Sequence, residues 1–128
     1  MKELPPSLTF DGVVTVDSLE HLAEPAAVLN QLLGLVSPSG WLWISTPNSA
    51  SLTALLTGGR WAEAHKPGHL MLFSSHSLER VIAAAGWKRL RRLEWRVDYN
   101  RGALARTAHF ALQTLRLDGE LRYLAYKH

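Results

Sequence analysis

Residues 10–48, FDGVVTVDSLEHLAEPAAVLNQLLGLVSPSGWLWISTPN, decide the fold of this chain of 128 residues. The β-branched run of Val13, Val14 and Val16 predicts a short strand that is covered on both faces. Glu24 and Pro25 then open a predicted helix, because proline suits the first helical position. The apolar residues of this helix recur at helical spacing and give it one apolar face: Val28, Leu29, Leu32, Leu33 and Val36.

A turn and a second strand complete the stretch, and the remaining sequence repeats the alternation of helix and strand. Residues 37–40, Ser-Pro-Ser-Gly, predict the end of the first helix, and Pro47 stops a strand over 41–46. Ser74 or Ser75 caps a later helix, which ends where Gly86 can adopt a left-handed conformation. The other predicted elements are a helix within 49–60, a loop at 61–73, a strand at 87–97, a helix at 98–117 and a strand at 121–126. This alternation predicts a single α/β domain over residues 1–128.

Composition excludes several classes of protein. The chain has no cysteine and therefore no disulfide or zinc–thiolate site, and its 47% hydrophobic and 20% charged residues are typical of a globular domain. No apolar run approaches the roughly 18 residues that a membrane span needs, and the first ten residues have no signal-peptide core. We therefore expect a cytoplasmic protein with no membrane partner.

Charge is distributed unevenly along the sequence. Residues 1–59 carry one lysine and five acidic residues, whereas residues 60–128 carry thirteen lysines and arginines and six acidic residues. The basic half includes Lys88, Arg89, Arg91, Arg92 and Arg96. Such a group can bind nucleic acid or an anionic substrate, and it can equally form a solvated surface of a strand and a helix. We expect the solvated surface, and no nucleic acid among the partners.

The motifs within residues 10–48 resemble those of class I S-adenosylmethionine (SAM) dependent methyltransferases from their fourth strand onward. The resemblance rests on Phe10-Asp11, on Leu19-Glu20-His21 and on Thr46-Pro47-Asn48. Within the family, the chain is similar to the ubiquinone-biosynthesis O-methyltransferases. It implies a Rossmann-like sheet whose strands correspond to strands four to seven, in the order 4-5-7-6 with the last strand antiparallel. It also implies methyl transfer from SAM to a small-molecule acceptor.

In that family a glycine-rich turn after the first strand holds most of the cofactor. Only nine residues precede Phe10, and the sequence contains no G-x-G-x-G motif. We therefore expect the chain to be the C-terminal half of a methyltransferase domain, which binds SAM poorly and is inactive by itself.

The candidate site follows the first predicted strand. The resemblance implies that Asp17, Ser18 and Leu19 lie beside the methionine part of SAM, and either His21 or Asp17 is the candidate base. The alternative is that Asp17 and Ser18 only turn the chain out of the sheet.

Some relatives bind a divalent metal ion through a cluster of this kind. Here the corresponding ligands for Mg²⁺ or Mn²⁺ are Asp17, Glu20, His21 and His69. Asp17 replaces the glutamate of those relatives and is shorter by one methylene. The alternative is that Glu20 and His21 hydrogen-bond a loop without any metal. Trp61 either covers the acceptor pocket or packs in the core.

A second function class is a non-catalytic interaction module. In the resembled family the first strand of this chain has a neighbour on each side, so its outer edge is expected to be open here. We therefore expect either a homodimer or a partner protein that supplies the missing strands.

Overall fold

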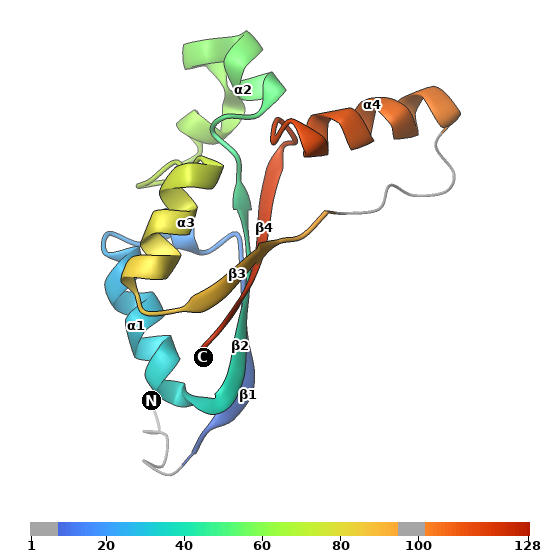
Figure 1. Ribbon diagram of the computed structural model, residues 1–128. Coiled ribbons are helices and arrows are strands. Elements are labelled where there is room, and N and C mark those ends of the chain that lie inside the picture. Colours follow the sequence, from blue (N-terminus) through green and yellow to red (C-terminus); the bar gives the residue numbers. More distant parts are fainter. Residues whose placement is uncertain (1–7, 95–101) are drawn as a thin grey trace.

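The computed structural model describes residues 8–94 and 102–128 of the chain. Figure 1 shows a mixed α/β arrangement, in which an open sheet is flanked by helices. The predicted fold class is confirmed, and the order of the strands explains where the candidate site lies.

The sheet has four strands in the order β1-β2-β4-β3. β1 (Phe10–Val16) is parallel to β2 (Val36–Pro47), as a strand–helix–strand unit requires. β4 (Glu120–Tyr126) is antiparallel both to β2 and to β3 (Lys88–Arg92). The predicted order, with an antiparallel last strand between its two neighbours, is confirmed.

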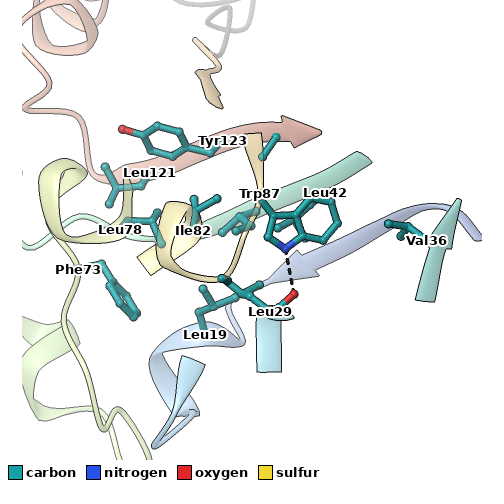
Figure 2. Packing of buried hydrophobic residues seen from close by; sticks show 13 residues of the cluster. Leu19, Leu29, Val36, Leu42, Phe73, Leu78, Ile82, Trp87, Leu121 and Tyr123 are labelled. Atoms are coloured by element: carbon teal, nitrogen blue, oxygen red, sulfur yellow. Dashed lines mark hydrogen bonds between the residues drawn. The ribbon is translucent and has the colours of Figure 1, made fainter. Parts of the chain in front are cut away.

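Two helices cover one face of this sheet and build the core against it (Figure 1). α1 (Pro25–Leu35) and α3 (Ser75–Ala84) contact each other there. Figure 2 shows the buried side chains between the helices and the strands, and one hydrogen bond among them. The Trp87 indole Nε1 donates this bond of 2.9 Å to the Leu29 carbonyl, so the chain entering β3 is tied to α1. Trp87 is therefore a core residue.

Local sequence signals set the ends of these helices. Pro25 occupies the first turn of α1 directly after Glu24. Ser74 and Ser77 form a capping box at the start of α3, since each side chain accepts a hydrogen bond from the backbone N–H of the other residue. Gly86 follows α3 with a φ of 97°, a conformation that favours glycine. These predictions are confirmed.

The predicted turn at residues 37–40 is wrong. β2 begins at Val36 and runs through the Ser-Pro-Ser-Gly segment without a break. Val36 pairs with Phe10 of β1, and the Gly40 carbonyl accepts a hydrogen bond of 3.0 Å from the Lys127 N–H. Pairing with residues distant in sequence therefore makes a strand of a segment whose composition favours a turn.

The prediction that β1 is covered on both faces is also wrong. The side chains of Val14 and Val16 are 57% and 52% exposed, whereas Val13 packs against the core. Both covering helices lie on the face of Val13, and a strand places successive side chains on opposite faces. β1 also pairs only with β2 among the strands that the structure describes, so its outer edge is open.

The carboxyl ends of β1 and β2 meet at one edge of the sheet, and a buried asparagine organises the chain there. The Asn48 N–H donates to the Gly119 carbonyl at 3.0 Å, and its side-chain Nδ2 donates to the carbonyls of Arg116 at 3.0 Å and Asp118 at 2.8 Å. Asn48 thus fastens the end of β2 to the segment that enters β4. This brings the first residue of β4 to the same edge.

Two further helices extend beyond that edge in Figure 1, namely α2 (Leu52–Thr57) and α4 (Ala103–Thr114). The strand predicted at 87–97 and the helix predicted at 98–117 are both present but shorter, and residues 95–101 of those predictions lie outside the described residues. Within residues 8–94 and 102–128, no helix is both long and apolar enough to span a membrane.

Candidate functional site

The chain leaves β1 through a sharp turn formed by Asp17 and Ser18. Asp17 has a φ of 43°, in the left-handed region, and its N–H donates to the Ser45 carbonyl at 3.0 Å. The Ser18 hydroxyl donates to the Val16 carbonyl at 2.7 Å. Both residues therefore turn the chain out of the sheet, and Asp17 also lines the cavity described below.

A single 3₁₀ turn, Leu19–His21, follows, with Leu19 in the core and both Glu20 and His21 at the site. The Leu19 side chain is 1% exposed and belongs to the hydrophobic core, where it anchors the turn. Leu19 is not among the residues that line the cavity.

Glu20 is a buried carboxylate, with only 2% of the residue exposed. Its Oε2 accepts a hydrogen bond of 2.8 Å from the Thr46 hydroxyl, and its backbone carbonyl accepts from the N–H groups of Leu70 and Met71 at 2.7 and 3.1 Å. Glu20 Oε1 is buried without a hydrogen-bond partner. A buried carboxylate oxygen in that state is costly unless a ligand completes its contacts.

His21 and His69 come from segments far apart in the sequence and meet beside Glu20. Their ring centroids are 4.8 Å apart with the rings nearly perpendicular. His21 Nδ1 lies 2.8 Å from the Gly68 carbonyl, which can only accept, so this nitrogen carries the proton. The His69 side chain is 5% exposed, and its buried Nδ1 has no hydrogen-bond partner.

Three of the four predicted metal ligands are therefore brought together. One ligand atom from each of Glu20, His21 and His69 lies within 4.8 Å of the others. Asp17 is not in this group, although it lines the same cavity. The hydrogen bonds of Glu20 and His21 to neighbouring loops also agree with the alternative in which these residues hold the loops in place.

The first residue of β4, Glu120, lies on the other side of the end of β2. Its Oε1 accepts from the Ser45 hydroxyl, and its Oε2 forms an ion pair with Arg122. Burial raises the pKa of the Glu120 carboxyl above its usual value, Arg122 opposes that shift, and the negative charge of Asp17 adds to it. Glu120 is thus a firmly held carboxylate at the edge where ligands of α/β sheets collect.

These groups surround one cavity of about 630 Å³ at the carboxyl edge of the sheet. Its lining combines residues from both strand ends, from the loop at 61–69 and from the start of β4, including Asp17, Glu20, His21, Trp61, His69 and Glu120. Trp61 is 8% exposed, so it packs firmly and lines the cavity at the same time. The volume is sufficient for a small molecule.

Lys66, which lines the cavity, is paired with Glu63, whose Oε2 lies 2.8 Å from the lysine Nζ. The hydrogen bond to Glu63 is the main cause that raises the Lys66 pKa, and the charges of Asp17 and Glu20 contribute in the same direction. The cavity is therefore an electrostatically negative environment.

Sequence reasoning missed Glu120, Glu63 and Lys66. Glu120 carries a usable signal, because an antiparallel last strand must begin at the edge where its parallel neighbours end. Glu63 and Lys66 lie in a loop without periodicity, and no pattern in the sequence points to them.

Comparison with known proteins adds to this geometry. A family model described as a methyltransferase domain matches residues 1–91. The ubiquinone biosynthesis O-methyltransferase of Paracidovorax citrulli is 40% identical over 48 residues, which are 38% of this chain and 20% of that protein.

Two solved structures share the fold. A SAM-dependent methyltransferase from Thermotoga maritima matches with a TM-score of 0.64 at 13% identity, over 95% of this chain and 59% of the other. A SAM-dependent methyltransferase from Archaeoglobus fulgidus matches with a TM-score of 0.58 at 20% identity, over 95% of this chain and 61% of the other. The chain therefore spans about three fifths of these structures and a fifth of the curated relative.

Proposed function

The chain belongs to the methyltransferase domain family, and from that premise we propose that it forms the acceptor side of the site in a SAM-dependent methyltransferase acting on a small molecule. The observation that carries the proposal is the cavity at the carboxyl edge of the sheet, lined by the loops that follow β1 and β2. Catalysis in such a site consists chiefly of holding the methyl group of the donor in line with the nucleophile.

Residues 1–128 correspond to the second half of such an enzyme. Their strands have the order expected for strands four to seven, and the sequence carries no G-x-G-x-G turn. Backbone N–H groups of a glycine-rich turn and a ribose-binding carboxylate supply much of the cofactor affinity in related folds. SAM therefore binds weakly to these residues alone, and Asp17 and Ser18 contact it from the acceptor side.

Glu20, His21 and His69 fit a divalent metal ion, which the resemblance to metal-dependent O-methyltransferases implies. The fit is supported by two buried atoms without hydrogen-bond partners, Glu20 Oε1 and His69 Nδ1, the second of which lies 3.9 Å from Glu63 Oε2. It is also supported by the Gly68 carbonyl, which fixes the protonated nitrogen of His21 and leaves the lone pair on Nε2. Two imidazoles and one carboxylate suit Mn²⁺ better than Mg²⁺.

The ion would supply Lewis-acid polarisation, which lowers the pKa of an acceptor hydroxyl. The residues of this chain have separate roles. Glu20 and His21 are held by hydrogen bonds to the loop at 68–71, and Asp17, which lines the cavity, is the candidate base for the proton of the acceptor. If no metal binds, His21 is the second candidate base.

A specific observation favours a second candidate function, that of an interaction module. Val14 and Val16 are more than half exposed, and the outer edge of β1 is unpaired among the described strands. Open apolar edges pair with other chains, either a second copy or a protein that supplies further strands.

Titration of the 128-residue protein with SAM tests the main proposal by calorimetry and by amide chemical shifts. We expect a dissociation constant weaker than about 100 µM, with shifts at residues 17–21 and 45–48. A dissociation constant of about 1 µM would contradict the assignment as a second half. Absence of shifts at those residues under saturating SAM would contradict the assignment as a methyltransferase site.

A further inference from the structure

Ser45 positions two carboxylates of the cavity at once. Its backbone carbonyl accepts the Asp17 N–H at 3.0 Å, and its side-chain hydroxyl donates to Glu120. Ser45 itself is fully buried near the end of β2, between β1 and β4. Asp17 and Glu120 are therefore held on either side of one rigid strand.

Glu120 is fixed at both carboxylate oxygens and still faces the cavity. Ser45 bonds Oε1 and Arg122 pairs with Oε2, yet 35% of the Glu120 side chain is exposed. Each carboxylate oxygen can accept more than one hydrogen bond. A side chain that is oriented in advance and partly open binds a donor at little entropic cost.

The lining of the cavity carries an excess of negative charge. Four carboxylates, those of Asp17, Glu20, Glu63 and Glu120, stand against a single lysine, Lys66. Lys66 is already paired with Glu63 and Arg122 with Glu120, so the charges of Asp17 and Glu20 remain in excess. The buried Glu20 has one oxygen without a hydrogen-bond partner, Oε1, whose contacts a cation in the cavity, either a metal ion or an ammonium group, would complete.

We propose that the cavity takes a methyl acceptor bearing an ammonium group, and that Glu120 binds this ammonium. The proposal rests on the proposed function for the identity of the cavity as an acceptor site. Glu120 is then a specificity residue that distinguishes amines from anions of the same size.

The electrostatics of the cavity support this assignment. Burial is the main cause that raises the pKa of Glu120 and the hydrogen bond to Glu63 the main cause that raises the pKa of Lys66, and the negative charge of Asp17 adds to both shifts. An ammonium group would relieve the repulsion between the carboxylates, whereas a carboxylate or phosphate on the acceptor would increase it. Trp61 lines the same cavity, and an indole ring attracts a cation.

Two probes that differ only at one end test the proposal on the unmodified protein. Tyramine and 4-hydroxyphenylacetate share the phenol ring, and one ends in an ammonium and the other in a carboxylate. In titrations followed by amide chemical shifts, we expect tyramine to bind at least about tenfold more tightly, with shifts at Asp17 and Glu120. Equal affinity, or tighter binding of 4-hydroxyphenylacetate, would overturn the proposal.

Matched variants identify the residue responsible. Glu120→Gln keeps the shape and a hydrogen-bond acceptor but removes the charge. It should weaken tyramine binding about tenfold and should not weaken the binding of 4-hydroxyphenylacetate. Asparagine tolerates the left-handed conformation of residue 17, so Asp17→Asn should weaken tyramine binding less than Glu120→Gln does. The same change at the exposed Glu94, outside the cavity, should have no effect. Equal effects of Glu120→Gln and Glu94→Gln would overturn the role of Glu120.

The outcome is separable from that of the main proposal, because no step of this experiment requires SAM. If tyramine does not bind more tightly than 4-hydroxyphenylacetate, the proposal of an ammonium-bearing acceptor is wrong, and the result of the SAM titration is unaffected. If tyramine binds selectively but SAM causes no amide chemical-shift changes, the ammonium-binding site is supported and the proposed methyltransferase function is contradicted.

Discussion

Thr46 donates a hydrogen bond of 2.8 Å from its hydroxyl to Glu20 Oε2, and both side chains are buried. The bond joins the end of β2 to the turn that follows β1. It fixes one oxygen of the carboxylate and leaves Oε1 as the acceptor without a partner. Thr46 therefore orients the central carboxylate of the candidate site from within the sheet.

Replacement of Thr46 by valine should destabilise the protein through Glu20. Valine matches the shape of threonine but cannot donate, so a second oxygen of the buried carboxylate would lose its partner. We expect the free energy of unfolding to fall by about 1–3 kcal/mol, measured by urea denaturation. Thr57→Val, which changes an exposed hydroxyl bonded within α2, is the control and should cost less than about 0.5 kcal/mol. Equal losses in the two variants would contradict this prediction.

Mn²⁺ should raise the melting temperature if Glu20, His21 and His69 bind it, because a ligand of the native state stabilises that state. The double variant Glu20→Ala, His21→Ala should abolish the rise. His76→Ala, at an exposed histidine of α3, should retain it. Differential scanning fluorimetry with increasing Mn²⁺ provides the measurement. If the parent protein shows no rise at about millimolar Mn²⁺, the three residues have a structural role only.

Tyr123 should make the protein less stable at alkaline pH. Burial raises the pKa of its hydroxyl to about 12, and the hydrogen bond of 2.6 Å to Glu79 adds to the shift. The unfolded chain loses this proton near pH 10 and the folded protein near pH 12, so stability is complete below about pH 10 and declines as pH rises through 12.

Urea denaturation between pH 9 and 12 measures that decline. For a shift of this size we expect Tyr123 to account for on the order of 2 kcal/mol. Tyr123→Phe should lower stability at neutral pH but show a shallower decline above pH 10. The same steepness in the parent and the variant would exclude Tyr123 as the cause.

β1 should mediate association of the chain. Its edge is open, and Val14 and Val16 expose apolar surface beside it. Light scattering at about 100 µM should show a dimer, and Val14→Pro should favour the monomer because proline cannot donate to a neighbouring strand. Val14→Thr, which keeps the N–H and the β-branched shape, should remain dimeric. A parent protein that is monomeric at this concentration, with the amides of residues 12–16 protected from hydrogen exchange, would contradict the prediction.

The sequence predicts most of the elements, because their signals are local. Pro25, Ser74 and Gly86 mark helix ends through their own conformational preferences, and the structure agrees with each. The turn predicted at residues 37–40 is wrong, because their local preference for a turn is outweighed by pairing with distant segments. Exposure of Val14 was not predictable from its β-branched neighbours, because it depends on which face the helices cover.

In the candidate site, too, features that depend on contacts between distant segments are harder to predict from the sequence than local ones. The approach of His69 to Glu20 and His21 is expected only from the resemblance to metal-dependent relatives, since His69 lies 48 positions after His21 in the sequence. The antiparallel direction of the last strand predicts the edge at which it begins, but that Glu120 is the residue at the cavity depends on the register of β4 against β2, in which Glu120 lies opposite Pro47. That register is a property of the assembled sheet.

The position of β4 also sets the order in which the protein can be completed during synthesis. β1, α1 and β2 are adjacent in sequence and can associate as soon as they have left the ribosome, whereas β2 pairs with residues 120–126 only after more than seventy further residues have been added (120 minus 47). Until then β2 remains an open edge, and Ser45 has no Glu120 to bond. Glu120 is therefore the last carboxylate to join the cavity, and the nascent chain exposes two unpaired strand edges in the interval.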